Sequence, residues 1–317
     1  MGMELSHGGH LTHGRPGTVS AKPFNFVRYG IKDIETGEID YGEMLATAKK
    51  TKPKIIIAGF SSYPRELNYD KFAEIGNEVG AVLMADMAHI AGLIAGKALK
   101  NPFDSGFHVI TTTTHKTLRG PRGAMILSQG TVSNPLKPVD KTVDNLPTLI
   151  DRAVFPGIQG GPHMHVIAAK AVAFGEAQKP DFQDYCQQIL KNAKRLADEM
   201  MKRGFKLITN GTDNHLILAD VKTSFNLDGG EVEEVLDEIG LTLNKNVIPD
   251  DPLPPFKPSG IRLGTPAITT RGLKENDMAQ VAEWMLQAVK NRKDTKKLNQ
   301  LANEVKEYCL QFPLPSD

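Results

Sequence analysis

Short apolar runs alternate with amphipathic segments along the first half of the chain. Four runs are typical of buried β-strands, at residues 54–60, 81–85, 108–114 and 123–127. Between the first two, residues 69–79 carry apolar side chains at helical spacing. Near-continuous apolar strands separated by a helix belong to parallel sheets with both faces covered. The pattern therefore predicts an α/β fold with a mostly parallel sheet.

From about residue 163 the pattern changes to longer amphipathic helices. Helices are expected at 163–179, 182–203, 230–239, 275–292 and 295–310, and short strands at 215–220, 241–243 and 261–263. The change predicts a large α/β domain over 1–175 and a smaller α+β domain over 176–317, and 317 residues suffice for two domains. The Pro-rich stretch 249–258 is expected to be a rigid loop of the second domain.

Composition narrows the class of protein. The chain has 38 Lys and Arg against 37 Asp and Glu, a net charge of +1, so we expect neither a nucleic-acid nor a membrane partner. No apolar run approaches the roughly 18 residues of a membrane span. The two cysteines, Cys186 and Cys309, lie far apart in segments with a polar helical pattern, which fits free thiols in a reducing compartment. A cytoplasmic protein is expected.

The strongest chemical signal is the string TTTTHKTLRGPRG at residues 111–123. Its threonines form a predicted strand that ends at His115 and Lys116, at the carboxyl edge where open α/β sheets bind ligands. A lysine that is desolvated or close to other cations forms Schiff bases with carbonyl compounds. The string therefore indicates a nucleophilic lysine, and a solvated loop lysine remains the alternative.

A second signal is the string ADMAHIAG at residues 85–92, in which Asp86 ends the preceding strand. A carboxylate at a strand end, thirty residues before a strand-end lysine, suits a pyridoxal phosphate site, because the pyridinium nitrogen of that cofactor needs an acidic partner. The alternative is that Asp86 caps the next helix. His89, taken alone, is expected to be a hydrogen-bonded structural histidine.

Histidines cluster in the string SHGGHLTHG at residues 6–14, where His7, His10 and His13 recur every third residue. Neutral imidazole is a common zinc ligand, so a metal site is one interpretation. Flat rings beside glycines, which permit close backbone approach, also suit stacking on a planar ligand. His163 and His165 in GGPHMH form a weaker pair of the same kind.

Together these segments resemble serine hydroxymethyltransferase, a pyridoxal phosphate enzyme of the aspartate aminotransferase fold type, fold type I. The matching strings run in the family's order from residue 1 to about residue 272. They are SHGGHLTHG, FSSYPR, DMAHIAG, TTTTHKTLRGPRG, FPGIQGG, GTDNHL, NKNVIP and SGIRLGTPA. The occurrence of TTTTHKTLRGPRG together with SGIRLGTPA makes the resemblance specific.

The resemblance implies roles for the residues of the cofactor site. Lys116 would hold pyridoxal phosphate as a Schiff base with His115 beside it, Asp86 would pair with the pyridine nitrogen, and His10 would stack on the ring. Gly161 would offer a backbone donor to the cofactor phosphate of a neighbouring subunit. Further hydrogen bonds to the cofactor or to its reacting substituents are implied for Ser61, Thr113 and His89.

The resemblance also implies the substrates and the assembly. Arg262 would bind the substrate carboxylate, a task that favours a forked guanidinium over lysine. The folate would contact Leu5, Gly9, Leu11, Asn246, Pro254, Pro255 and Phe256. The implied reaction converts serine and tetrahydrofolate reversibly to glycine and 5,10-methylenetetrahydrofolate, in a cytoplasmic homodimer.

One departure from the family changes the expectation. In the family SHGGHLTHG lies well inside the chain, whereas here it begins at residue 6. The resemblance thus implies an N-terminal truncation that removes a Ser-Gly phosphate cradle, a proton-transferring glutamate and active-site tyrosines, and we expect impaired activity. The alternatives are an inactive truncated paralogue or gene fragment that acts at most as a subunit partner, another fold-type-I enzyme such as a threonine aldolase or an aminotransferase, and a histidine-based metal protein.

Overall fold

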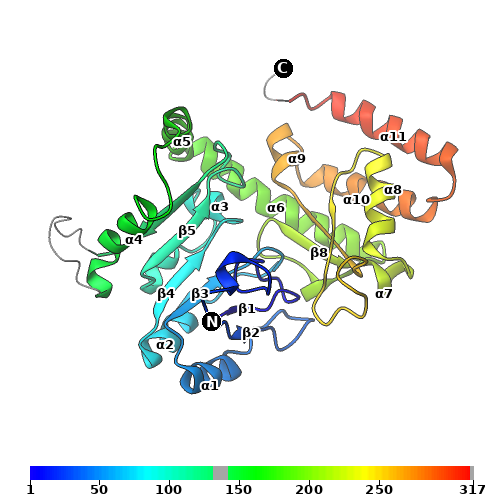
Figure 1. Ribbon diagram of the computed structural model, residues 1–317. Helices are drawn as coiled ribbons and strands as arrows, with labels where there is room; N and C mark the ends of the chain where they lie inside the picture. The colour runs from blue at the N-terminus through cyan, green and yellow to red at the C-terminus, as the bar shows by residue number, and fades with distance from the viewer. Residues whose placement is uncertain (131–141, 315–317) are drawn as a thin grey trace.

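The computed structural model describes residues 1–130 and 142–314 (Figure 1). In the first half, β3 (Ile55–Gly59), β4 (Val82–Asp86) and β5 (Val109–Thr113) run parallel, and β6 (Ala124–Ser128) adds antiparallel to β5. Each strand lies within one residue of its predicted ends. The α/β class with a mostly parallel sheet is therefore confirmed.

The helix predicted at residues 69–79 is α2 (Tyr69–Val79). The Asn68 side chain accepts the Lys71 N–H at its start, and Gly80, in the left-handed region, ends it. Phe72 and Ile75 are buried against the sheet. The short helix α3 (Ala91–Ala95) follows β4. These connections place the carboxyl ends of β3, β4 and β5 at one edge of the sheet.

Three elements near the N-terminus were not predicted. They are β1 (Gly2–Met3), which pairs in parallel with β2 (Arg28–Tyr29), and α1 (Tyr41–Thr51). Two-residue strands are too short to show a period. Helix α1 buries only Met44 and Ala48, so its sequence carries little apolar periodicity.

The second half is built around an antiparallel sheet of order β7-β8-β10-β9. The strands are β7 (Lys206–Leu207), β8 (Leu216–Asp220), β9 (Asn244–Asn246) and β10 (Gly260–Gly264). The prediction of a strand at 241–243 was wrong. The strand forms three residues later because the segment of Asn244–Asn246 pairs with β10. The Pro-rich residues 249–258 form a loop between β9 and β10, as predicted.

Helices surround both sheets. Of the predicted helices, 163–179 is α5 (Met164–Ala177), 182–203 is α6 (Pro180–Lys202), 230–239 is α8 (Gly229–Glu238), 275–292 contains α10 (Met278–Lys290), and 295–310 is α11 (Thr295–Leu310). The remaining helices are α4 (Leu146–Val154), α7 (Val221–Phe225) and α9 (Pro266–Arg271). Within the described ranges, no helix has the length and apolarity needed to cross a membrane.

Two large hydrophobic cores underlie the two lobes in Figure 1. The first core includes Ile189 of α6 and the second begins with Leu196 of the same helix. Helix α6 therefore contributes to both cores and crosses the middle of the molecule. The predicted domain boundary at residue 175 stays a prediction.

One expectation about the cysteines was wrong. Cys186 does not lie in polar surroundings: it is fully buried on α6, and its thiol donates to the Gly92 carbonyl on α3. The amphipathic pattern of α6 is real, but Cys186 belongs to the apolar face of that helix, which packs on the first lobe. Both cysteines are free thiols, and Cys309 is half-buried.

Candidate active site

The carboxylate of Asp86 is held at the carboxyl end of β4. Its Oδ2 lies 2.9 Å from His13 Nε2, and its Oδ1 accepts the Ala88 N–H at 3.1 Å. Burial alone would raise the pKa of Asp86, but the hydrogen bond and charge of His13 and the Ala88 N–H together lower it. Asp86 is thus an ionised group with a fixed orientation. It caps this turn and not α3, whose N-cap is Ile90.

Lys116 follows β5 at the same sheet edge and is half-buried. Within the described residues, no hydrogen bond or ion pair engages its amine. Burial lowers the pKa of Lys116, the Asp86 charge raises it and the Arg262 charge lowers it, with a net decrease. A desolvated amine with a lowered pKa close to another cation is a nucleophile suited to Schiff-base chemistry.

Three imidazoles, those of His10, His89 and His215, lie within electrostatic range of this lysine. The rings of His89 and His215 stack with centroids 5.9 Å apart and planes 18° apart. Burial, reinforced by nearby cations that include Lys116 and Arg262, lowers the pKa of His89 to about 2 and that of His215 to about 3. Burial and the charges of His13 and Lys116 also lower the pKa of His10. His10, His89 and His215 are therefore held uncharged at neutral pH.

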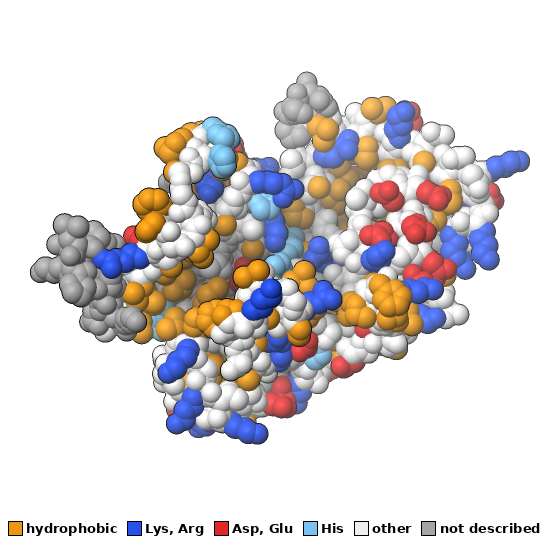
Figure 2. Space-filling view, viewed as in Figure 1, with side chains coloured by type: hydrophobic (Ala, Val, Ile, Leu, Met, Phe, Trp, Pro, Cys, Tyr) orange, Lys and Arg blue, Asp and Glu red, His pale blue; other side chains and the backbone are white. Residues whose placement is uncertain are grey.

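Arg262 enters the cluster from β10 in the second lobe. Its Nη1 donates to the Ser61 carbonyl at 2.9 Å and its Nε to Asn244 Oδ1 at 3.1 Å. Burial lowers its pKa. The Ser61 side chain in turn lies 3.5 Å from His89 Nε2. A guanidinium from one lobe is thereby fixed beside the strand ends of the other lobe, and Figure 2 shows histidine and Lys/Arg side chains along the hollow between the lobes.

Two other predicted site residues lie beside these groups. Thr113 Oγ1 donates to the Ala88 carbonyl at 3.2 Å, which ties the end of β5 to the turn after β4. His115 Nδ1 accepts the Gly123 N–H at 3.5 Å. Both residues therefore tie the segment before Lys116 to neighbouring loops.

The histidines of SHGGHLTHG have three different partners. His7 Nε2 lies 3.6 Å from Asp250 Oδ1, His10 Nδ1 lies 2.8 Å from Thr12 Oγ1, and His13 binds the strand-end carboxylate described above. The rings of His10 and His13 meet edge to face at 5.7 Å. In residues 1–130 and 142–314, no group of three or more His, Cys, Asp or Glu side chains could hold a metal ion.

The loop that carries these histidines is pressed against the loop after β3. The Gly8 carbonyl accepts the N–H groups of Ser61 and Ser62, and Gly8 has a φ of +108°. A Cβ on Gly9 would lie 2.3 Å from the Met3 carbonyl oxygen, so only glycine fits at that position. These contacts place His10 and His13 above the sheet edge.

The segments predicted to contact folate lie on two loops that meet. His7, between Leu5 and Gly9, reaches Asp250, which opens the loop that carries the Pro254–Phe256 segment. Leu11 is 42% exposed and Phe256 is 81% exposed. Asn246 on β9 is half-buried and donates to the Val247 carbonyl at 2.6 Å. The geometry thus brings both predicted folate segments to one side of the molecule.

Gly161 is not brought to this cluster. It lies in an exposed loop, and no atom lies within 4 Å of the position that its Cβ would take. His163 and His165 are also exposed, and their rings meet edge to face at 5.6 Å. Within the described residues, nothing connects this loop to Lys116.

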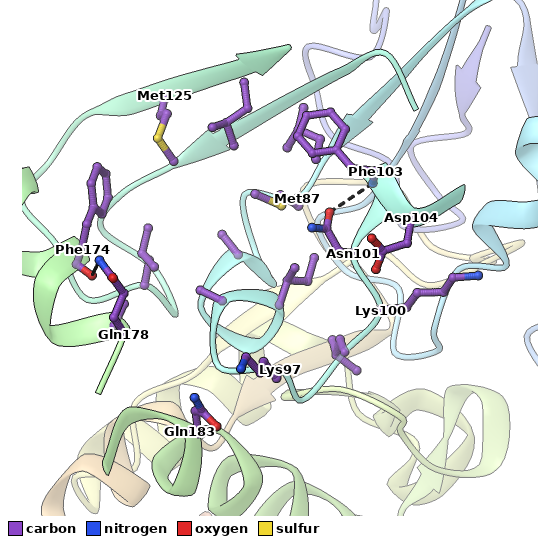
Figure 3. Close-up of a pocket in the computed structure, with 18 residues that line it drawn as sticks. Met87, Lys97, Lys100, Asn101, Phe103, Asp104, Met125, Phe174, Gln178 and Gln183 are labelled. Atoms are coloured by element: carbon purple, nitrogen blue, oxygen red, sulfur yellow. Dashed lines mark hydrogen bonds between the residues drawn. The ribbon is translucent and has the colours of Figure 1, made fainter. Parts of the chain in front are cut away.

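A large cavity lies elsewhere in the described part of the chain (Figure 3). It has a volume of about 940 Å³ and is lined mainly by apolar side chains that include Met87, Phe103, Met125 and Phe174. Ile110 of β5 points into it, so strand alternation places Thr113 on the opposite face of the sheet. None of the predicted site residues lines this cavity. The chemistry of the strand edge, and not cavity volume, marks the candidate site.

Three members of the cluster were missed as functional residues: His13, assigned only to the histidine group, and His215 and Asn244. The signals were present, because His13 follows His10 at a regular interval and the other two lie inside the strings GTDNHL and NKNVIP. Their partners lie far away in the sequence, however, and no spacing rule connects them.

Comparison with protein-family models identifies the family of this chain. The family model described as Serine hydroxymethyltransferase matches residues 1–285. The chain belongs to the serine hydroxymethyltransferase family. The serine hydroxymethyltransferases are fold-type-I, pyridoxal phosphate enzymes that interconvert serine and tetrahydrofolate with glycine and 5,10-methylenetetrahydrofolate. The predicted family, fold type, reaction, cofactor and co-substrate are therefore confirmed, and the match supports none of the alternative enzymes or the metal protein.

The donor set of the site fits the cofactor of the serine hydroxymethyltransferase family. An ionised carboxylate fixed by His13, an amine with a lowered pKa and neutral imidazoles meet at one sheet edge. These are the groups that a pyridinium nitrogen, an aldehyde and a flat ring require. The N-terminal truncation, and the impaired activity expected from it, stay predictions.

Proposed function

We propose that Lys116, Asp86 and Arg262 are the central residues of serine–glycine interconversion in this chain. The observation that carries the proposal is their convergence: an amine without a partner among the described residues lies within electrostatic range of a fixed carboxylate and a half-buried guanidinium. Perturbed titratable groups gathered in this way are typical of active sites.

Pyridoxal phosphate would be held by Lys116 through its aldehyde and by Asp86 through its pyridine nitrogen, with His10 against the ring. The cofactor supplies an electron sink for the carbanion of the amino-acid substrate. His13 keeps Asp86 oriented and charged through the 2.9 Å hydrogen bond. Hydrogen bonds from Ser61, Thr113 and His89 complete the proposed pocket, and Gly161 would serve a neighbouring subunit's cofactor.

Arg262 would bind the α-carboxylate of serine or glycine. Its guanidinium keeps donors free after its bonds to Ser61 and Asn244. Holding the carboxylate at one fixed point orients the bond that is to break, and such orientation is a large part of enzymatic rate enhancement.

Proton transfer would use the Lys116 amine, whose lowered pKa makes it easier to deprotonate. The lowered pKa of Lys116 favours a neutral amine that can accept a proton at Nζ. His89, with a pKa near 2, stays neutral, and its Nε2 lies within 3.5 Å of Ser61 Oγ. His115, which precedes Lys116 and accepts the Gly123 N–H, would hold the lysine segment in place.

Tetrahydrofolate would bind where the two loops meet, against apolar and amide groups. The proposed contacts are Leu5, Gly9, Leu11, Asn246, Pro254, Pro255 and Phe256. Exposed apolar side chains such as Leu11 and Phe256 favour a flat, partly apolar ligand at this position.

A cytoplasmic homodimer is the proposed assembly. Apolar side chains that are 43–87% exposed gather on α5 and on the segment before it: Phe155, Ile158, Met164, Ile167 and Val172. Such a patch is typical of a protein interface. Sedimentation of the wild type and of a Met164→Glu/Val172→Glu variant tests this: a dimer that becomes a monomer supports the proposal, and a wild-type monomer contradicts it.

A visible-absorbance titration with pyridoxal phosphate tests the proposed site. The wild type is expected to develop a band that changes when glycine and tetrahydrofolate are added. Lys116→Ala is expected to develop none, because the band requires the amine. Absence of a Lys116-dependent band in the wild type would contradict the proposed site.

A further inference from the structure

The guanidinium of Arg262 is held on two sides by neutral acceptors. Nε donates to Asn244 Oδ1 at 3.1 Å, and Nη1 donates to the Ser61 carbonyl at 2.9 Å. A guanidinium has five N–H donors, so three remain after these two bonds: one on Nη1 and both on Nη2. Because Nε is occupied, the donors that remain for a ligand are all on Nη1 and Nη2.

The position of Asn244 follows from the sheet. Asn244 on β9 is directly opposite Arg262 on β10 in the antiparallel register, and opposite residues project to the same face. The Asn244 amide is itself oriented, because its Nδ2 donates to the Lys245 carbonyl at 2.7 Å. Only the oxygen of the amide can then face Arg262 Nε. The acceptor is therefore fixed before any substrate arrives.

The neutrality of this acceptor matters as much as its position. In the parts of the chain that the structure describes, no carboxylate forms an ion pair with Arg262. A carboxylate at position 244 would form a charge-assisted bond to Nε and neutralise the guanidinium. An amide orients the guanidinium and leaves its charge available for an anionic ligand.

We propose that Asn244 is a positioning residue that presents the Nη1–Nη2 end of Arg262 to the carboxylate of the amino-acid substrate. By occupying Nε, Asn244 excludes the side-on fork formed by Nε and Nη2, and it sets the preference for ligands that carry a carboxylate. This inference rests on the proposed role of Arg262 and adds the residue that determines how Arg262 is used.

The test compares Asn244→Asp and Asn244→Ala with the wild-type holoenzyme. Absorbance titrations give the Kd for glycine and for glycinamide, which lacks the carboxylate. Asn244→Asp is expected to raise the glycine Kd about 10- to 100-fold, the range for a charge-assisted hydrogen bond, and Asn244→Ala about 2- to 10-fold. The glycinamide Kd is expected to stay within about twofold in the Ala variant and not to rise in the Asp variant, since this ligand does not need the anion site.

Two controls separate positioning from a structural role. Asn226→Asp makes the same chemical change at an exposed residue that ends α7, and is expected to leave both Kd values unchanged. In an Arg262→Ala background, Asn244→Asp is expected to add no further loss of glycine affinity, because the two residues act as one unit. A distorted strand would instead weaken both ligands and tetrahydrofolate together.

The outcomes distinguish this inference from the function on which it rests. If the wild type shows Arg262-dependent glycine binding but Asn244→Asp and Asn244→Ala retain wild-type glycine affinity, the inference is wrong and the proposed function stands. If both ligands weaken equally, Asn244 is structural and the inference is also wrong. If the wild type shows no Arg262-dependent glycine binding, both fail. A selective loss of glycine affinity in the two variants supports the inference.

Discussion

The two faces of the large sheet, formed by β3 to β6, differ in cavity volume and in the chemistry of their side chains. One face opens into the 940 Å³ cavity beneath α3, whose walls are mainly apolar. The other leads to the strand ends that carry Asp86 and Lys116; the N-terminal segment beside them, with His10 and His13, lines a cavity of only about 80 Å³. Volume would select the first region, yet a fixed carboxylate, an amine with no partner among the described residues, and shifted pKa values lie in the second. Cavity size is the usual guide to a binding site; here the perturbed titratable groups are the better one.

Substitutions on the two faces should differ most in their effect on catalytic activity. Lys116→Ala is expected to reduce the rate of serine cleavage by about 10²–10⁴-fold or more, the range for losing a positioned proton-transfer group. Steady-state assays with serine and tetrahydrofolate measure this. Met125→Ala on the cavity wall is the matched control and should retain activity within about twofold of wild type. A comparable loss in Met125→Ala would show that the cavity takes part in catalysis.

The cavity face should instead control stability. Ile110 is 1% exposed at this face, so Ile110→Ala is expected to lower the free energy of unfolding by about 2–5 kcal/mol. Urea unfolding at 25 °C measures this. The Kd for pyridoxal phosphate should stay near the wild-type value while the protein is folded. A variant with unchanged stability and weakened cofactor binding would reverse the assignment of the two faces.

His215, which is buried at the candidate site, predicts a pH dependence of the free energy of unfolding. The pKa of His215 falls to about 3 in the folded protein, against an ordinary value of 6.5, so between these values the unfolded chain binds the additional proton. Stability is therefore expected to fall as pH decreases below 6.5, by about 2 kcal/mol between pH 7 and pH 5 from this residue alone.

Urea unfolding at both pH values, with His215→Gln as the variant, measures this contribution. The variant should show a smaller difference between the two pH values, whereas His163→Gln on an exposed loop should leave the difference unchanged. An identical pH dependence in wild type and His215→Gln would contradict the prediction.

The smallest expected effect concerns the thiol that packs α6 against α3. Burial raises the pKa of Cys186 to about 12, so it should resist alkylation at pH 8, whereas the half-buried Cys309 should react. Mass spectrometry after brief iodoacetamide treatment should find one label on the native chain and two on the unfolded chain. Rapid labelling of native Cys186 would show that the apolar face opens easily.

Much of the fold could be predicted from the sequence because the large sheet follows simple rules. Its strands are apolar runs of the expected length, and α2 has a clear period and an Asn68 cap. The strand Asn244–Asn246 could not be found in this way, since asparagine and lysine disfavour strands and pairing with β10 creates the strand. Local pattern therefore predicts the elements that bury their own side chains.

The same distinction between local pattern and tertiary pairing applies to the residues of the candidate site. Asp86 and Lys116 could be predicted because each ends a recognisable strand. The contact of His13 with Asp86 joins residues 73 positions apart, and that of Arg262 with Ser61 joins residues 201 apart. No periodicity encodes such contacts, since tertiary packing decides them. Sequence thus predicts which chemistry is present, and the structure adds which groups orient it.

The position of helix α6 determines how the two lobes unfold. Its 23 residues span about 35 Å, and within two turns its apolar face passes from Ile189, in the first core, to Leu196, in the second. Because α6 contributes to both cores, unfolding of either lobe would remove part of the core packing of the other. Heat or denaturant should therefore unfold both lobes in a single cooperative transition. The candidate site at the strand ends should keep its structure until that transition.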